Sequence, residues 1–220
     1  MQKYFKFLLN LLFEEHCVGC KKSGLPVCVD CLLGAEPATE PNNTNIWSAF
    51  AFHDPVVRKS IQKLKYGKNR DIAKPLAEAL YDRSLELIIE KRLIWGLGSD
   101  DVIMLIPVPL SRKRLLERGY NQARLIAEAY ADLDQSMSFT VLNDVLYKIR
   151  DTASQVSVKD RKKRLENLHD VFEIKNKEPI LDKCVILFDD VTTTGATLAE
   201  CKKVLKKAGA REIFSITVAH

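Results

Sequence analysis

The chain has 220 residues, of which 46% are hydrophobic and 29% are charged, and its formal net charge is +5. This length and composition indicate a soluble globular protein with room for one domain and a small appendage. The mild positive charge is compatible with phosphorylated ligands or nucleic acid but requires neither. No apolar run reaches the ~18 residues that a membrane-spanning helix needs, so the sequence predicts no membrane span.

The N-terminal segment, residues 1–13, combines two lysines with a short apolar run and could pass for a signal peptide. However, Asn10 interrupts the run, two glutamates follow it, and no small-residue cleavage site is present. The apolar residues recur instead at helical spacing, which predicts an amphipathic helix that packs on the core. We therefore expect the protein to be cytoplasmic.

Two cysteine pairs follow, each with two intervening residues, and seven residues separate the pairs: Cys17, Cys20, Cys28 and Cys31. Each pair offers two thiolates about one turn apart, which suits a tetrahedral zinc ion. Disulfides are disfavoured in a reducing cytoplasm. Two redox motifs are a weaker alternative because no thioredoxin-like strand precedes either pair. Four thiolates leave no open coordination position, so the spacing predicts structural Zn²⁺ rather than a catalytic metal.

Residues 34–45 are rich in proline and asparagine and predict a linker, which would separate an N-terminal unit (1–45) from a main domain (46–220). The strands predicted in the main domain are 47–52 (at a sheet edge), 102–106, 141–147, 171–174, 185–188 (central) and 213–218. The predicted helices begin at Asp54, span residues 74–94, lead from Arg118 to Leu133, and follow the central strand. Alternation of this kind indicates the α/β class, with a mostly parallel sheet flanked by helices.

Basic residues gather in two of the predicted loops. The loop after the 102–106 strand carries Ser111, Arg112, Lys113 and Arg114, and positive charges at the carboxyl end of a strand suit a pyrophosphate. Residues 150–167 are polar and strongly basic, which predicts a mobile loop with a short helix. Basic runs are also common on ordinary solvated surfaces.

The most informative stretch, residues 185–197, begins with four apolar residues and continues with two carboxylates, Asp189 and Asp190. The next residues form a hydroxyl-rich turn that opens a helix: Thr192, Thr193, Thr194, Gly195, Ala196 and Thr197. Ligands of open α/β sheets bind at the carboxyl ends of strands. A helix N-terminus offers N–H groups and a positive dipole end to a phosphate. Gly195 would let the backbone approach the anion closely.

Carboxylates beside a phosphate would repel it, so this pair is better explained if it accepts hydrogen bonds from sugar hydroxyls. The order of groups therefore predicts a site for a ribose 5-phosphate. A simpler alternative is a core strand with an acidic cap and a polar turn that bind no ligand.

The same stretch resembles the phosphoribosyl pyrophosphate signature of the type I phosphoribosyltransferases. Almost the whole chain further resembles the ComF family of competence-associated proteins. This second resemblance rests on the four cysteines, residues 65–67, 107–109 and 118–122, the set Arg150, Thr152, Gln155, Arg164 and Asn167, and residues 189–197.

The resemblance implies a type I phosphoribosyltransferase-like domain with an N-terminal zinc-binding unit. It implies that phosphoribosyl pyrophosphate is the ligand, with Mg²⁺ carried on the ligand's own oxygens. Asp189 and Asp190 would orient the ribose, and the turn up to Thr197 would hold the 5-phosphate. Residues 111–114 would hold the leaving pyrophosphate. The residues expected to close over the ligand are Arg150, Thr152, Gln155, Arg161 and Arg164.

Two functions remain open at this point. The first is a glycosyltransferase that passes the phosphoribosyl group to an unknown acceptor, linked to DNA uptake, natural transformation or the use of DNA as a nutrient. The alternative is a non-catalytic module that senses phosphoribosyl pyrophosphate or binds single-stranded nucleic acid, since fold does not fix function. Single-stranded DNA and other competence proteins are the expected partners. The candidate phosphate contacts are Lys65, Lys68, Arg112, Lys113 and residues 161–164.

Overall fold

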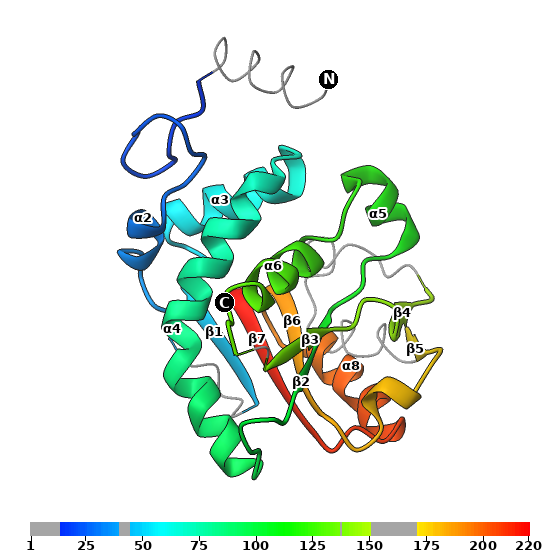
Figure 1. The fold of residues 1–220 in the computed structure, drawn as a ribbon. Coiled ribbons are helices and arrows are strands. Elements are labelled where there is room, and N and C mark those ends of the chain that lie inside the picture. The colour runs from blue at the N-terminus through cyan, green and yellow to red at the C-terminus, as the bar shows by residue number, and fades with distance from the viewer. Residues whose placement is uncertain (1–13, 40–44, 137, 151–170) are drawn as a thin grey trace, which may run out of the picture.

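A computed structural model of the protein describes residues 14–39, 45–136, 138–150 and 171–220. Its centre is a five-stranded sheet of order β1-β7-β6-β2-β3 in which all neighbouring strands are parallel (Figure 1). The strands are β1 (Ile46–Phe50), β2 (Ile103–Pro107), β3 (Phe139–Val141), β6 (Cys184–Val191) and β7 (Glu212–Ala219). The predicted α/β class is confirmed, with β6 as the middle strand and β1 at an edge.

Helices cover both faces of this sheet (Figure 1). The helices of the described residues are α2 (Val29–Leu33), α3 (Pro55–Tyr66), α4 (Ala73–Ile94), α5 (Arg112–Arg118), α6 (Gln122–Ala131) and α8 (Ala196–Lys207), with the 3₁₀ turns η1 (Arg70–Ile72) and η2 (Glu178–Ile180). Alternate residues of β6 belong to different cores. Ile186 and Phe188 pack in the core that contains α4 and α6, whereas Val185 and Leu187 pack in the core that contains α8. Burial on both faces explains the continuous apolar run of β6.

Helix α3 begins where the sequence predicts it. Asp54 is its N-cap, and the carboxylate accepts the backbone N–H groups of Val56 at 2.8 Å and Val57 at 3.1 Å. Its buried positions, Val57, Ser60, Ile61 and Leu64, recur at helical spacing. The cap fixes the start of the helix, and this buried stripe fixes which way its remaining side chains face.

The prediction of a single strand over residues 141–147 is wrong. Val141 ends β3 in the main sheet, whereas β4 (Leu146–Lys148) pairs antiparallel with β5 (Phe172–Ile174) in a separate two-stranded sheet. Asn143 and Asp144 lie between them in a bend, and the Asn143 amide donates to Glu128 Oε1 at 3.0 Å. The polar pair therefore ends one strand and allows the chain to leave the sheet.

The cysteine segment packs on the main domain. Cys17, Val27 and Leu32 are buried in the same core as α3 and α4. From α4, the Arg83 guanidinium donates to the carbonyls of Leu33 and Ala35, both at 2.7 Å, and of Ala49 at 2.9 Å. One side chain thus links the cysteine segment, the following chain and β1.

Some expectations fall on residues that the structure does not describe. The predicted N-terminal helix, residues 1–13, is one of them. Four of the five residues expected to close over the ligand, Thr152, Gln155, Arg161 and Arg164, also lie outside the described residues, as do the nucleic-acid contacts predicted at residues 161–164. Within the described ranges, no helix has the length and apolar character needed to cross a membrane.

Candidate functional site

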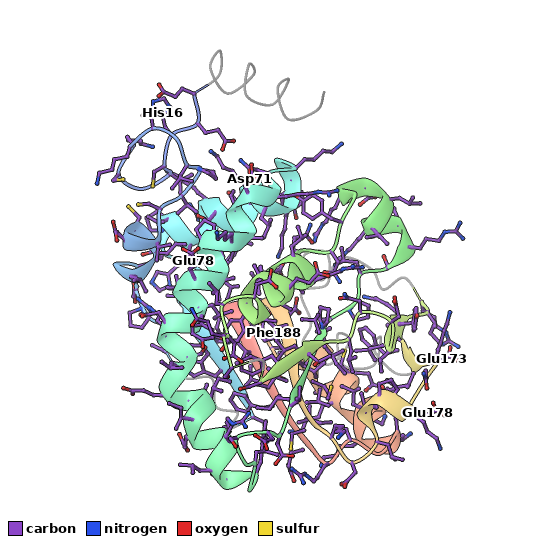
Figure 2. The ribbon with its side chains drawn as sticks, in the orientation of Figure 1. His16, Asp71, Glu78, Glu173, Glu178 and Phe188 are labelled. Atoms are coloured by element: carbon purple, nitrogen blue, oxygen red, sulfur yellow. The ribbon has the colours of Figure 1, made fainter. Side chains whose placement is uncertain are left out.

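The two carboxylates occupy the carboxyl end of β6. They directly follow Phe188, which is fully buried and packs edge-to-face on Tyr130 near the centre of the molecule (Figure 2). Asp189 Oδ1 accepts the backbone N–H of Asp190 at 2.8 Å. Asp190 is 7% exposed, and its Oδ1 lies 2.8 Å from Nζ of Lys65 at the end of α3. The pair is therefore held between β6 and a cation from a distant helix.

Burial and the neighbouring Asp190 charge raise the pKa of Asp189 to about 7, although Lys65, the Asp190 N–H and Lys148 act in the opposite direction. This is the response expected of two carboxyl groups that share one poorly hydrated site. The protonation of Asp189 is consequently sensitive to pH near neutrality and to the charges of Lys65 and Lys148.

The turn after the acidic pair is anchored at both ends. The Thr192 N–H donates to the Ala219 carbonyl at 3.0 Å, and Thr192 is buried. Thr194 Oγ1 accepts the Ala196 N–H at 3.4 Å where α8 begins. Thr193 and Thr194 are exposed at the helix N-terminus. This arrangement offers hydroxyl and N–H donors beside a positive dipole end, which suits an anion.

Gly195 is the N-cap residue of α8 and has φ of 71°. A Cβ at this position would lie 2.7 Å from Ile46 Cδ1. From the sequence, Gly195 is expected to let the backbone approach an anion. The structure adds two separate requirements, a left-handed backbone and contact with β1.

A polar cleft of about 130 Å³ joins these groups, roughly ten times the space that one buried water needs. It is lined by Lys65, residues 108–111, Arg114, Arg118, residues 121–123, Lys148 and residues 189–197. Four of these side chains are cations, from α3, α5 and β4, and they line the same cleft as the acidic pair and the turn. The cleft can therefore accept a ligand that carries both hydroxyl groups and negative charges.

The predicted pyrophosphate residues separate into two groups. Ser111 and Arg114 line the cleft, whereas Arg112 and Lys113 are exposed and are not among its lining residues. The reason is that residues 112–114, predicted as a loop, form the first turn of α5, which Ser111 caps by accepting the Arg114 N–H at 3.4 Å. Arg150 is also exposed and outside the lining.

Several lining residues have no role in the ligand site that the sequence predicts. The sequence indicates Lys65 only as a nucleic-acid contact and gives Lys148 no role. Arg118 donates to Gln122 Oε1 at 2.7 Å. Asn121 caps α6 and donates to the Val108 carbonyl at 2.9 Å, which fixes the β2–α5 connection. The sequence does contain one indication of Lys65, Arg118 and Asn121. They belong to residues 65–67 and 118–122, which carry the family resemblance but have no predicted role in ligand binding.

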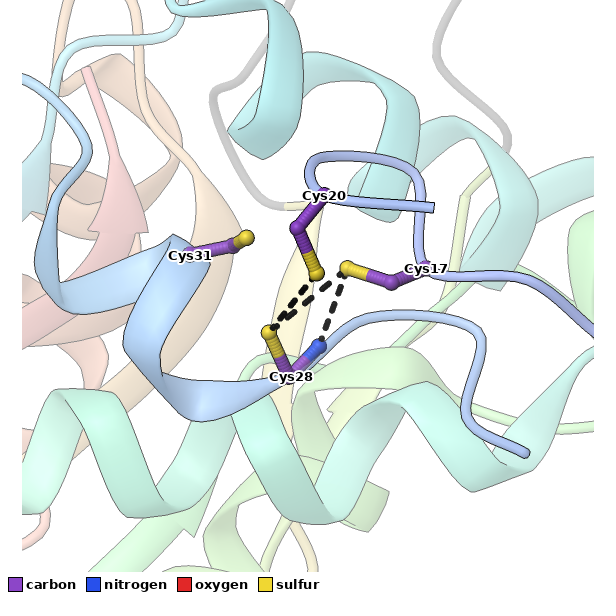
Figure 3. A group of neighbouring side chains, drawn as sticks. All are labelled: Cys17, Cys20, Cys28 and Cys31. Atoms are coloured by element: carbon purple, nitrogen blue, oxygen red, sulfur yellow. Dashed lines mark hydrogen bonds between the residues drawn. The ribbon is translucent and has the colours of Figure 1, made fainter. Parts of the chain in front are cut away.

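The four predicted zinc ligands come together in space (Figure 3). All four sulfur atoms lie within 4.8 Å of one another, and Cys28 Sγ is 3.7 Å from both Cys17 Sγ and Cys20 Sγ. Tetrahedral coordination with Zn–S bonds of about 2.3 Å would separate the sulfurs by about 3.8 Å. A Cβ at Gly19 would lie 2.7 Å from Cys31 Sγ, so a glycine is needed where the first pair turns. These residues could bind a metal ion such as zinc.

The thiols of this cluster differ in their pKa values. Burial raises the pKa of Cys17, but backbone N–H groups of Cys28, Cys20 and Gly19 outweigh it and lower the pKa to about 6. The neighbouring Cys28 thiol and burial raise the pKa of Cys31 to about 12. The four neighbouring thiols can therefore all be ionised at once only when a cation is bound among them, which is the property of a metal-binding set.

Several known proteins are similar to the chain, among them three competence and DNA utilization proteins. No protein-family profile matches the chain. The chain is 40% identical over 111 residues to Competence protein F of Haemophilus influenzae, covering 50% of this chain and 46% of that protein. It is 28% identical over 194 residues to DNA utilization protein YhgH of Escherichia coli O157:H7, covering 88% and 80%. It is 30% identical over 206 residues to Competence protein ComFC of Streptococcus pneumoniae, covering 93% and 80%.

Proposed function

Because this chain belongs to the ComF family, we propose that it binds phosphoribosyl pyrophosphate with Mg²⁺ in the cleft at the end of β6. One observation carries the proposal. A carboxylate pair, a hydroxyl-rich turn at a helix N-terminus and a group of cations border a single cleft. These are the groups that a sugar diol, a 5-phosphate and a pyrophosphate require, respectively.

In this proposal Asp189 and Asp190 accept hydrogen bonds from the ribose hydroxyls, and residues 192–197 bind the 5-phosphate through N–H and hydroxyl groups. Ser111 and Arg114 bind the pyrophosphate, and Arg112 and Lys113 contribute charge from the surface of α5. Mg²⁺ neutralises the pyrophosphate oxygens when it is bound. The expected closing residues, from Arg150 to Arg164, exclude water from the bound ligand.

We propose further that the protein is a phosphoribosyltransferase with an unknown acceptor. Pyrophosphate would leave carbon 1 of the ribose as the acceptor bonds to it. A screen of nucleobases for ligand-dependent thermal shift, followed by a pyrophosphate-release assay, tests this directly. Release that depends on one acceptor supports transfer. Binding of phosphoribosyl pyrophosphate without release for any acceptor favours the alternative, a non-catalytic sensor.

The names of the relatives motivate a cellular role. They are called competence and DNA utilization proteins, and we propose that this chain acts in DNA uptake or use, in the cytoplasm and together with other competence proteins. Lys68, Arg112 and Lys113 are exposed and would contact the phosphates of single-stranded DNA. Lys65 does not belong to this surface because it is paired with Asp190 inside the cleft.

We propose that residues 1–45 form a structural zinc unit and that residues 46–220 form the phosphoribosyltransferase-like domain. The sulfur geometry and the burial of Cys17 and Leu32 against α3 and α4 support this division of the chain into a structural unit and a ligand-binding domain. The ion would fix the chain between the two cysteine pairs and so stabilise the surface that packs on α4.

A further inference from the structure

Lys65 enters the cleft from outside the β6 signature. Its Nζ lies 2.8 Å from Asp190 Oδ1, and the two side chains are only 18% and 10% exposed. A charge pair this poorly hydrated is costly to form, because both ions lose much of their water. Stability alone therefore does not explain why a lysine occupies this position.

The packing of α3 supports this point. The helix buries Val57, Ser60, Ile61 and Leu64 in the core. Lys65 follows Leu64 and so lies about 100° around the helix from it, where its ammonium lines the polar cleft. The core stripe of α3 is complete without Lys65, and its charged end is directed at the acidic pair.

The charges around the acidic pair indicate what Lys65 does there. Lys65 of α3, Lys148 of β4 and the buried Cys201 thiol of α8 act on it, and Arg114 and Arg118 of α5 line the same cleft. His220, which follows β7, lies beside the adjoining turn, with its Nε2 3.0 Å from the Thr193 carbonyl oxygen. Among these cations, Lys65 has a 2.8 Å contact with a carboxylate oxygen. Burial and the neighbouring Asp190 charge favour protonation of Asp189, and a protonated carboxyl loses an acceptor that a sugar hydroxyl needs. Lys65 opposes that protonation.

We infer that Lys65 is a positioning residue that keeps the Asp189–Asp190 pair ionised and oriented, so that it can accept sugar hydroxyls at neutral pH. The inference rests on the proposed ribose 5-phosphate site and adds a residue to it. Lys65 acts through the carboxylates rather than by contact with the sugar.

The test measures the affinity for ribose 5-phosphate, without magnesium, from pH 5 to pH 9. Four proteins are compared: wild type, Lys65→Met, Lys65→Arg and Lys63→Met. Methionine keeps most of the alkyl chain and removes the charge. Lys63 is exposed on the same last turn of α3, so Lys63→Met changes the net charge equally. The ligand phosphate titrates identically in all four series, and differences between them therefore report on the protein.

In wild type the affinity should fall as pH decreases through the range in which the pair takes up a proton. In Lys65→Met the midpoint of that fall should rise by about 1–3 pH units, which weakens binding at pH 7 about ten-fold or more. Lys65→Arg should restore most of the wild-type profile, and Lys63→Met should reproduce it. An equal loss of affinity at every pH in Lys65→Met, or an unchanged midpoint, would overturn the inference.

A second measurement separates this inference from the proposed function. Carbon-13 NMR of the aspartate carboxyl groups, in the absence of ligand, follows protonation of the pair in wild type and Lys65→Met. If wild type binds no ribose 5-phosphate at any pH, the proposed ribose 5-phosphate site fails. A higher carboxyl midpoint in Lys65→Met would still support the electrostatic role, and coincident carboxyl titrations would refute it.

Discussion

Gly195 is the residue at which the signature turn depends most directly on the rest of the fold. Its left-handed backbone is unfavourable for any other residue, and Ile46 of the edge strand occupies the space where a side chain would begin. The turn that is proposed to bind a phosphate thus packs against β1, which is far from it in the sequence. Binding and stability are consequently linked at this position.

We predict that Gly195→Ala lowers the free energy of unfolding more than Gly119→Ala. Gly119 has φ of 80°, and a Cβ at this position would have no neighbouring atom within 4 Å, so alanine there incurs only the backbone cost, about 1–2 kcal/mol. Gly195→Ala should lose roughly 0.5–1 kcal/mol more, because the Cδ1 end of the Ile46 side chain must turn away to admit the new methyl group. Urea unfolding of both variants measures the difference.

The Ile46→Val background provides the control. Valine lacks the Cδ1 atom that causes the contact, so the additional loss at Gly195 should shrink in that background. Equal losses for the two glycine variants in wild type would show that the contact with Ile46 carries no cost.

At the scale of the elements, the cysteine segment is the part whose packing should depend on a metal. We predict one zinc ion per chain by metal analysis, held by the four cysteines. In Cys28→Ser, hydrogen exchange should become faster in residues 14–39, because the loop between the pairs loses its fixed geometry. Exchange in α8 should remain as in wild type.

A serine at Cys184 makes a suitable control, because this buried cysteine lies at the start of β6 and belongs to no metal-binding set in the described part of the chain. Cys184→Ser should leave the zinc content unchanged. Purified protein that is folded throughout residues 14–39 but contains no zinc would contradict the account of this segment.

The elements also show what the sequence could and could not predict. The middle strand was predictable because burial on both faces produces an uninterrupted apolar run, from Cys184 to Phe188. Residues 141–147 were misassigned because apolar residues flank Asn143 and Asp144 closely enough to resemble one strand. Lys65 could not be assigned to the acidic pair, since the docking of α3 brings them together and no local pattern records such a contact.

The cations of helix α5 were predictable from the sequence only in part. Arg114 and Arg118 line the cleft while Arg112 and Lys113 do not, and this follows from the spacing of four residues that places two side chains on one face of a helix. A helix prediction at residue 112 would have separated these cations correctly. The proline-rich stretch before it favoured a loop, which hid that periodicity.

For the whole molecule, the proposed contact with single-stranded DNA predicts a dependence on salt. Neutralising Lys68, Arg112 and Lys113 together, each to glutamine, should flatten the slope of log affinity against log salt by about 2, since each phosphate contact contributes about 0.7. Fluorescence anisotropy with a labelled oligonucleotide measures the slope.

A matched triple variant is available at the opposite end of β6. Lys177, Lys183 and Lys207 are exposed there, and the same substitutions should leave the slope nearly unchanged. Equal slopes for the two triple variants would indicate that single-stranded DNA binds to no particular surface of the protein. An affinity for single-stranded DNA that does not change with salt concentration would contradict the proposed contacts with DNA phosphates.

The central claim is that the end of β6 binds phosphoribosyl pyrophosphate, and calorimetric titration at fixed Mg²⁺ tests it most directly. Wild type, Asp190→Asn and Asp182→Asn are compared. Asparagine preserves shape beside Lys65, and the exposed Asp182 is a charge-matched control outside the cleft. Asp190→Asn should weaken binding roughly ten- to hundred-fold through loss of charge-assisted hydrogen bonds, while Asp182→Asn binds like wild type. No binding by wild type at millimolar ligand, or wild-type affinity in Asp190→Asn, would contradict the account.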